Sequence, residues 1–202
     1  MENTPAISVS LRRLQSEDLN AVVKLHRSAF AYTANSKLGS EHLKRLYSAM
    51  LQDPDSIVLV AIKNSMVGGV VSATRDTEEF KKRFKAGLSL QEKFSLAMRM
   101  LFHPITLMEL LKENQSERPV VFQNRVVKGC LTAIAVNSEC RQSGIGRALV
   151  SAIEEFFKQN GDPSFYLFTR ADNTVSRQFY ERLGFVELEQ RGKDIVLIRE
   201  LH

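Results

Sequence analysis

Arg141-Gln142-Ser143-Gly144-Ile145-Gly146 is the stretch of this sequence that says most about its fold. An apolar run over 131–136 precedes it and an amphipathic run from Arg147 follows it, which predicts a strand, a glycine-rich turn and a helix. The first N–H groups of a helix have no acceptor within the helix, and glycines let a bulky anion approach them closely. We therefore interpret this stretch as a binding loop for a phosphate-bearing ligand, with pyrophosphate as the group that suits it best.

The loop differs from two other phosphate-binding patterns. A nucleoside-triphosphate P-loop requires Gly-Lys-Ser/Thr, which this chain lacks. The dinucleotide fingerprint requires a third glycine three residues after the second, where this chain has Leu149. A Gly-x-Gly turn also occurs where a left-handed residue is needed for structural reasons alone. A second signal is therefore required to separate a binding loop from a plain turn.

The segment that begins at Asn173 supplies this second signal. Asn173 is followed by the small residue Ser176, then by the aromatic pair Phe179-Tyr180 and by Gly184-Phe185. In this order, and at this spacing from Arg-x-x-Gly-x-Gly, the two segments resemble the GNAT acetyltransferase superfamily. Two motifs in the right order are far more specific than either one alone.

The resemblance implies one acetyltransferase-like domain over residues 1–202. It is firm over 127–189, fair over 7–75 and absent over 76–118. The implied fold is α/β (α+β), with a mixed, twisted sheet of about seven strands flanked by helices. Apolar residues of 76–118 recur at helical spacing, so this segment is expected to be a helical insertion between the third and fourth sheet strands.

Hydrophobic periodicity and capping residues place the individual elements. Strands are expected near 7–12, 57–62, 66–74, 131–136, 165–170, 186–188 and 195–199. Helices are expected from Ser16 as the capping residue, from Ser40 to Pro54, and over 144–159 and 173–183. Gly68 and Gly69 predict a bulge in the strand that contains them.

The candidate cofactor residues begin with the glycines of the loop. Gly144 and Gly146 would bind pyrophosphate through their backbone N–H groups. The amides that would assist them belong to Gln142, Ser143 and Ile145. The side chains that would meet phosphate oxygens as charged donors belong to Arg141 and Arg147. The net charge of +5 would help to attract an anionic cofactor.

The resemblance identifies this cofactor as acetyl-CoA, used as a co-substrate. It implies that the strand before the loop parts from the next strand and binds the pantetheine arm through its main chain. The residues implied are Ile134, Ala135 and Val136, one of whose N–H groups would polarise the thioester carbonyl. Asn173 matches a family position that contacts the cofactor, and it also suits a helix cap.

Tyr180 matches the family's general acid and is the candidate catalytic residue. A thiol has a pKa of about 8.5 and a tyrosine a pKa of about 10, so a phenol can hydrogen-bond a leaving thiolate and pass it a proton. The alternative is a buried aromatic side chain, as for its neighbour Phe179. Adjacent helical residues face different directions, which leaves room for one of each kind.

The general base is not identified by the sequence. Many relatives have a glutamate in the strand that precedes the loop, where this chain has Thr132. The candidates are Asp76, Glu139, His103 and Asp172, each of which also has an ordinary structural interpretation. An amine with a pKa of about 8 needs no side-chain base, because roughly a tenth of it is neutral at pH 7.

Other partners and sites are not expected. The net charge of +5 is too small and too scattered for nucleic-acid binding. The four histidines have no ligand spacing with acids or cysteines, so no metal is expected. Cys130 and Cys140 would bracket a strand and lie about 20 Å apart, too far for a disulfide. No apolar run could span a bilayer and residues 1–20 lack a signal-peptide pattern, so a cytoplasmic location is expected.

The resulting functional hypothesis is transfer of an acetyl group from acetyl-CoA to a primary amine by direct attack. A small amine, such as an amino sugar, is the first acceptor class, because the insertion over 76–118 would roof a compact site. A protein or peptide amine is the second class, and a non-catalytic acyl-CoA sensor is the alternative to an enzyme. The insertion has two other interpretations, a contact with a partner subunit in a homodimer and, last, an interfacial membrane helix.

Overall fold

The computed structural model describes residues 9–94, 98 and 118–201. The strands are β1 (Val9–Arg13), β2 (Ser56–Lys63), β3 (Met66–Thr74), β4 (Val120–Phe122), β5 (Arg125–Val127), β6 (Cys130–Val136), β7 (Ser164–Arg170), β8 (Val186–Arg191) and β9 (Asp194–Glu200). The helices are η1 (Ser16–Asp18), α1 (Leu19–Ala29), α2 (Ala34–Lys37), α3 (Ser40–Gln52), α4 (Thr77–Ala86), η2 (Ser138–Cys140), α7 (Ile145–Gln159) and α8 (Thr174–Glu181).

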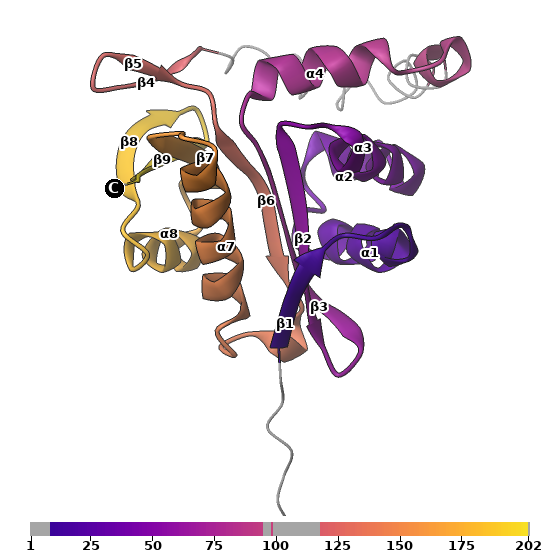
Figure 1. Ribbon diagram of the computed structural model, residues 1–202, viewed down its shortest axis with the longest axis horizontal. Coiled ribbons are helices and arrows are strands. Elements are labelled where there is room, and N and C mark those ends of the chain that lie inside the picture. Colours follow the sequence, from indigo (N-terminus) through magenta and orange to yellow (C-terminus); the bar gives the residue numbers. More distant parts are fainter. Residues whose placement is uncertain (1–8, 95–97, 99–117, 202) are drawn as a thin grey trace, which may run out of the picture.

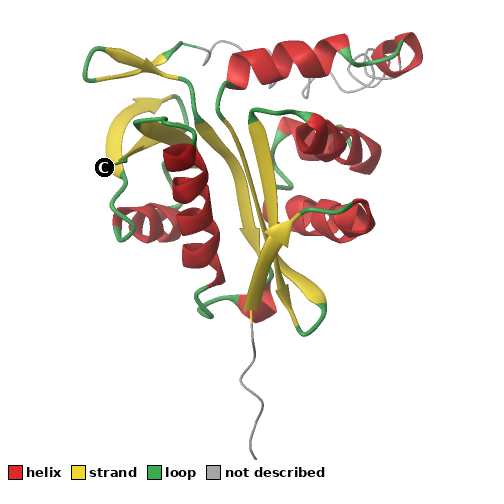
Figure 2. Ribbon diagram, viewed as in Figure 1, coloured by secondary structure: helices red, strands yellow, loops and turns green. Residues whose placement is uncertain are grey.

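Seven strands form one mixed sheet in the order β1-β2-β3-β6-β7-β9-β8. Strands β6 and β7 are parallel, and every other neighbouring pair is antiparallel. Helices α7 and α8 lie on one face of the sheet and α1, α2 and α3 on the other (Figures 1 and 2). The expected α/β fold with about seven strands is confirmed. No helix in the described part of the chain has the length and apolar character needed to cross a membrane.

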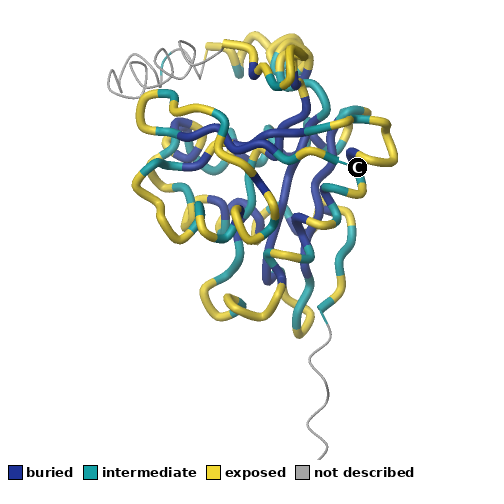
Figure 3. Tube along the Cα trace, turned by 90° about the vertical axis from the view of Figure 1, so that its left-hand side faces the viewer, coloured by how far each residue is buried: buried dark blue, intermediate teal, exposed yellow. Residues whose placement is uncertain are grey.

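The continuous apolar run of β2 is explained by a core on each face of the sheet. Ile57, Leu59 and Ala61 belong to the core under α7, whereas Val58 and Val60 belong to the core under α1 and α3. Successive side chains of a strand point to opposite faces, so a strand covered on both sides must be apolar throughout. Figure 3 shows the buried residues gathered along these central strands.

Helix α7 packs onto β3 at a point where β3 has glycine. A Cβ atom added to Gly69 would lie 2.8 Å from Ile145 Cγ2 and 3.1 Å from Leu149 Cδ1. Both of these α7 side chains are fully buried. The register of β2 and β3 shifts beside this contact, with Ala61 opposite Gly69 and Ile62 opposite Val67, which confirms the expected bulge.

One predicted helix start is wrong. Ser16 does not cap the first α-helix, because residues 16–18 form the 3-10 turn η1 before α1 begins at Leu19. The Asp18 carboxylate accepts a hydrogen bond from the Gln15 amide at 2.9 Å and pairs with Arg12 at 2.6 Å. This pairing to β1 stabilises the tighter turn and delays the start of the α-helix.

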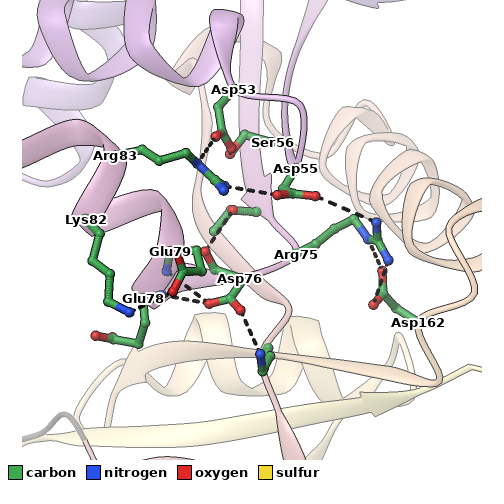
Figure 4. A network of polar contacts seen from close by, with 12 residues as sticks. Asp53, Asp55, Ser56, Arg75, Asp76, Glu78, Glu79, Lys82, Arg83 and Asp162 are labelled. Atoms are coloured by element: carbon green, nitrogen blue, oxygen red, sulfur yellow. Dashed lines mark hydrogen bonds and ion pairs between the residues drawn. The ribbon is translucent and has the colours of Figure 1, made fainter. Parts of the chain in front are cut away.

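Helix α4 begins the predicted insertion and is tied to the rest of the fold by ion pairs (Figure 4). Arg83 of α4 contacts Asp53 at 2.7 Å and Asp55 at 3.0 Å, in the turn before β2. Asp76 caps α4 by accepting from two of its amides and pairs with Lys128 at 2.9 Å. The rest of the expected insertion, 95–97 and 99–117, lies outside the described residues, so the insertion and its boundaries remain a prediction.

The position of α4 follows from the register of the sheet. Thr74, the last residue of β3, pairs with Cys130, the first residue of β6, and α4 starts three residues after Thr74. The glycine-rich loop follows the other end of β6, near Val136. Helix α4 therefore lies at the end of the sheet opposite to this loop (Figure 1). Strands β4 and β5 form a separate hairpin just before β6 in the chain. Hydrophobic periodicity did not predict this hairpin.

His26 of α1 is a titratable group inside the core between α1 and α3. Its side chain is 7% exposed, and its Nδ1 lies 2.8 Å from the Tyr47 hydroxyl of α3. Burial lowers the pKa of His26 to about 4, because the charged imidazolium would lose its hydration. His26 is therefore neutral in the folded protein near neutral pH.

We expect Gly69→Ala to lower the free energy of unfolding by about 1–3 kcal/mol, because the added methyl group overpacks the α7 contact. Denaturant unfolding monitored by circular dichroism measures this change. The matched control is Gly87→Ala at the end of α4, where the backbone is helical and the added Cβ would lie 3.4 Å from the nearest atom. The control should be neutral or slightly stabilising, and equal losses in both variants would contradict the packing argument.

We expect His26 to make the fold less stable on acidification. An unfolded histidine has a pKa of about 6.5, so the unfolded chain binds the proton first as the pH falls. Between about pH 6.5 and 4 the wild type should lose at most about 1.4 kcal/mol per pH unit, and roughly 3 kcal/mol in total, relative to His26→Gln. Denaturant unfolding at several pH values measures this difference. Curves that stay parallel for the two proteins would show that His26 is not buried in its neutral form.

Candidate functional site

The glycine-rich loop ends at the first turn of α7 in a left-handed conformation. Gly144 is the N-cap residue of α7, with φ of 79°, and a Cβ atom there would meet nothing within 4 Å. Gln142 also has a positive φ, of 60°, which is unusual for a residue with a side chain. Left-handed residues within such a turn bring successive N–H groups onto one concave side, an arrangement that suits anions.

The amides of this loop are unpaired donors. Cys140 and Arg141 donate to the turn before them, and the first bond of α7 runs from the Ala148 amide to the Gly144 carbonyl at 3.0 Å. Between these, in the described part of the chain, the six amides from Gln142 to Arg147 donate to no other residue. The N-terminus of α7 adds its partial positive charge at the same place. The predicted amides therefore lie together as one anion-binding surface.

Gly146 brings the two sequence motifs into contact. A Cβ atom added there would lie 3.2 Å from Phe179 Cζ of α8 and 3.9 Å from Val136 Cγ2 of β6. Glycine at this position lets α7 approach α8 and the end of β6. The anion-binding loop, the strand before it and the aromatic pair of α8 thus form a single region.

Strands β6 and β7 part at the start of β6. They pair only at Cys130 and Tyr166, where the Tyr166 amide donates to the Gly129 carbonyl at 2.9 Å. The later residues of β6 pair with β3 on one side and have no partner on β7. The sheet therefore opens beside β6, as the resemblance implied.

The direction of the free β6 groups follows from the ladder with β3. The Asn137 amide donates to the Gly68 carbonyl of β3 at 2.9 Å. N–H groups alternate in direction along a strand, so the Ala135 amide also faces β3, opposite Val70. The amides of Ile134 and Val136 face the opening toward β7. Of the three predicted strand residues, these two offer backbone groups there, whereas Ala135 contributes to the ladder.

Tyr180 lies on α8 next to Phe179, the residue that approaches Gly146. Its side chain is 7% exposed and packs against Phe179 and Phe185, with ring centroids 5.2 Å and 5.3 Å away. Burial raises the pKa of Tyr180, and the nearby Tyr32 and Cys130 add to the effect. Its hydroxyl has no hydrogen-bond partner among the described residues and is not fully enclosed. Tyr180 therefore keeps its proton at neutral pH and can donate it to a group in the opening.

Asn173, Arg141 and Arg147 are the predicted cofactor residues with polar side chains. Asn173 is the N-cap residue of α8, and its side chain accepts from the Ser176 amide at 3.0 Å. Arg141 and Arg147 are exposed, and within the described residues neither side chain forms an ion pair. Their guanidinium groups are thus available to an anionic ligand at the loop.

The candidate bases are not gathered at the opening. Asp76 caps α4 at the far end of the sheet and is held by Lys128. Asp172 is exposed and pairs with Arg170 at 2.9 Å, and Glu139 is exposed in η2. His103 lies outside the described residues. In the described ranges no group of three or more His, Cys, Asp or Glu side chains could hold a metal ion, and both cysteines are free.

Tyr32 is a site residue that sequence analysis did not find. It lies between α1 and α2, is 52% exposed, and its ring is 5.6 Å from the Arg170 guanidinium carbon at the end of β7. It is also an electrostatic neighbour of Tyr180. This contact joins residues far apart in sequence, so no local pattern could have indicated it.

The opened sheet and the anion-binding start of α7 define a ligand-binding α/β protein with the acetyltransferase fold. The family model described as the acetyltransferase (GNAT) family matches residues 107–185. The matched span contains both sequence motifs, the glycine-rich loop and the segment from Asn173 to Phe185. A solved structure of PaiA N-acetyltransferase from Thermoplasma acidophilum in complex with coenzyme A has a TM-score of 0.63, with 16% identity, and the similarity covers 96% of this chain and 99% of that one.

Two curated proteins are similar to a part of this chain. An uncharacterized N-acetyltransferase of Methanocaldococcus jannaschii is 29% identical over 77 residues, which cover 35% of this chain and 49% of that protein. N-alpha-acetyltransferase 30 of Schizosaccharomyces pombe is 34% identical over 65 residues, which cover 32% of this chain and 43% of that protein. The chain thus spans about half the length, or less, of the curated relatives it matches.

Proposed function

We propose that this chain is an acetyl-CoA-dependent N-acetyltransferase that acts on a primary amine. The observation that carries the proposal is the row of six unpaired amides, from Gln142 to Arg147, directly beside the opening between β6 and β7. Such a surface suits the pyrophosphate of a coenzyme, and the opening suits an extended arm that continues from it.

The residues around the loop fit this co-substrate. A Cβ atom at Gly144 would meet nothing within 4 Å, so no other side chain covers the loop there. Arg141 and Arg147 would pair with phosphate oxygens as charged donors. The pantetheine arm would lie along β6, where Ile134 and Val136 offer backbone groups. The coenzyme A complex of the PaiA enzyme, which has this fold, supports this assignment.

In the proposed reaction acetyl-CoA supplies an activated thioester. An amide of β6, at Ile134 or Val136, would donate a hydrogen bond to the thioester carbonyl oxygen and stabilise the negative charge that develops there. The neutral amine attacks, the C–N bond forms and the C–S bond breaks. Tyr180, kept protonated by burial, would donate its proton to the departing thiolate. The amine releases its extra proton to solvent.

Two observations bear on the acceptor class. The expectation of a small amine, such as an amino sugar, rests on an insertion that roofs the site. Helix α4, the start of that insertion, instead lies at the end of the sheet opposite to the loop, which speaks against such a roof. Similarity to an N-alpha-acetyltransferase favours a protein or peptide amine. Both classes therefore belong in one acceptor panel of amino sugars, polyamines, amino acids and peptides.

We expect Tyr180→Phe to lower kcat about 100-fold or more while acetyl-CoA still binds, because the variant loses only the proton donor. Acetyl transfer to the acceptor panel measures kcat. Thermal unfolding measures binding, because ligand at about 100 times its Kd adds about 2.7 kcal/mol, or roughly 5–10 °C for a chain of this size. Tyr166→Phe is the control, because its hydroxyl contacts Thr77 near α4 rather than the opening.

Three outcomes separate the alternatives. A thermal shift in both proteins, with turnover lost only in Tyr180→Phe, is the result expected of the enzyme. A thermal shift without turnover on any acceptor would favour the acyl-CoA sensor. No thermal shift with millimolar acetyl-CoA would mean that the loop is only a turn, and the proposed function would then be wrong.

A further inference from the structure

A chain of hydroxyl groups runs from the core of the protein to the opening. At its inner end, His26 Nδ1 lies 2.8 Å from the Tyr47 hydroxyl, and Ser72 of β3 is a polar neighbour of Tyr47. At its outer end, the Ser72 hydroxyl lies 2.7 Å from the Thr132 hydroxyl of β6. The chain therefore links α1, α3, β3 and β6 through four polar side chains in an apolar surrounding.

Thr132 occupies a bulge in β6. Ser72 pairs with Ala133 and Ala73 pairs with Leu131, so Thr132 is the extra residue between them. A bulge re-aims the side chain of its extra residue, and Thr132 is exposed whereas Ser72 and Leu131 are buried. Thr132 also lies two residues before Ile134, whose amide faces the opening, which puts the two about 7 Å apart along the strand.

Thr132 faces the side of the sheet away from α7. Its hydroxyl bonds Ser72, and Ser72 lies between Val71 and Ala73, which belong to the core under α7, so Ser72 and Thr132 point to the face of α1 and α3. Helix α7 lies on the other face (Figure 1). An acceptor that approached a thioester in the opening from the face of Thr132 would pass its hydroxyl.

The Thr132 hydroxyl directs its proton inward. It donates to the Ser72 carbonyl of β3 at 3.1 Å, and the Ser72 hydroxyl lies 2.7 Å away on the same side. Thr132 thus presents its remaining lone pair to the opening.

We propose that Thr132 is a positioning residue for the acceptor amine. Its lone pair accepts one N–H of the neutral amine, which turns the nitrogen lone pair toward the thioester carbonyl. The hydroxyl and the carbonyl of Ser72 hold the Thr132 hydroxyl in the orientation that this contact requires. The inference rests on the proposed function, and it assigns a role to the strand position where many relatives have glutamate.

The test compares Thr132→Val, which has the same shape without the hydroxyl, with Thr132→Ser, which keeps it. Loss of one uncharged hydrogen bond is expected to lower kcat/KM for the amine about tenfold in Thr132→Val. Thr132→Ser should restore most of this loss. The acetyl-CoA Kd, measured by titration calorimetry, should stay within about twofold in both variants, because neither change touches the loop.

Specific outcomes would overturn the proposal without touching the proposed function. Unchanged kcat/KM in Thr132→Val, with turnover and acetyl-CoA binding intact, would exclude the contact with the amine. Equal losses in Thr132→Val and Thr132→Ser would point to packing of the methyl group. Absence of turnover in the wild type would remove both proposals together.

Discussion

The close contact between α7 and Gly69 of β3 is the constraint on which the rest of the site depends. Ile145 and Leu149 fill the space that a side chain at position 69 would occupy, and this fixes the first turns of α7 against the sheet. The first turn of α7 also contains the last three of the unpaired amides, those of Ile145, Gly146 and Arg147. Gly146 then lets Phe179 of α8 approach, so the second motif is positioned by the first. The anion-binding surface is therefore a consequence of how α7 packs.

The opening beside β6 explains why the site is built mainly from backbone. A central strand without a partner on one side leaves N–H and C=O groups unpaired, which is costly unless water or a ligand satisfies them. The amides of Ile134 and Val136 face this space, and those of residues 142–147 continue it around the loop. Backbone groups impose little on side-chain identity, which is consistent with a shared fold at only 16% sequence identity.

The local sequence pattern was enough to predict the elements that carry the loop. It was not enough to predict contacts between segments that are far apart in the sequence. The strand, the left-handed glycine and the α7 helix follow from residues 131–159, where apolar periodicity and turn chemistry agree. The contact between Thr132 and Ser72 spans 60 positions and rests on a bulge that no local signal marks. The place of α4 depends on ion pairs between Arg83 and the turn before β2. Ser16 does not cap α1, because Asp18 forms an ion pair with Arg12 of β1.

The most direct measurement of the central claim is amide hydrogen exchange, resolved by residue with NMR, in the presence and absence of acetyl-CoA. The account predicts that slower exchange concentrates at residues 142–147 and at Ile134 and Val136, because these amides become donors to the ligand. Ala135, which already donates to β3, should change little. Protection that falls elsewhere, with no change at residues 142–147, would contradict the claim that unpaired backbone amides at the start of α7 form the cofactor site.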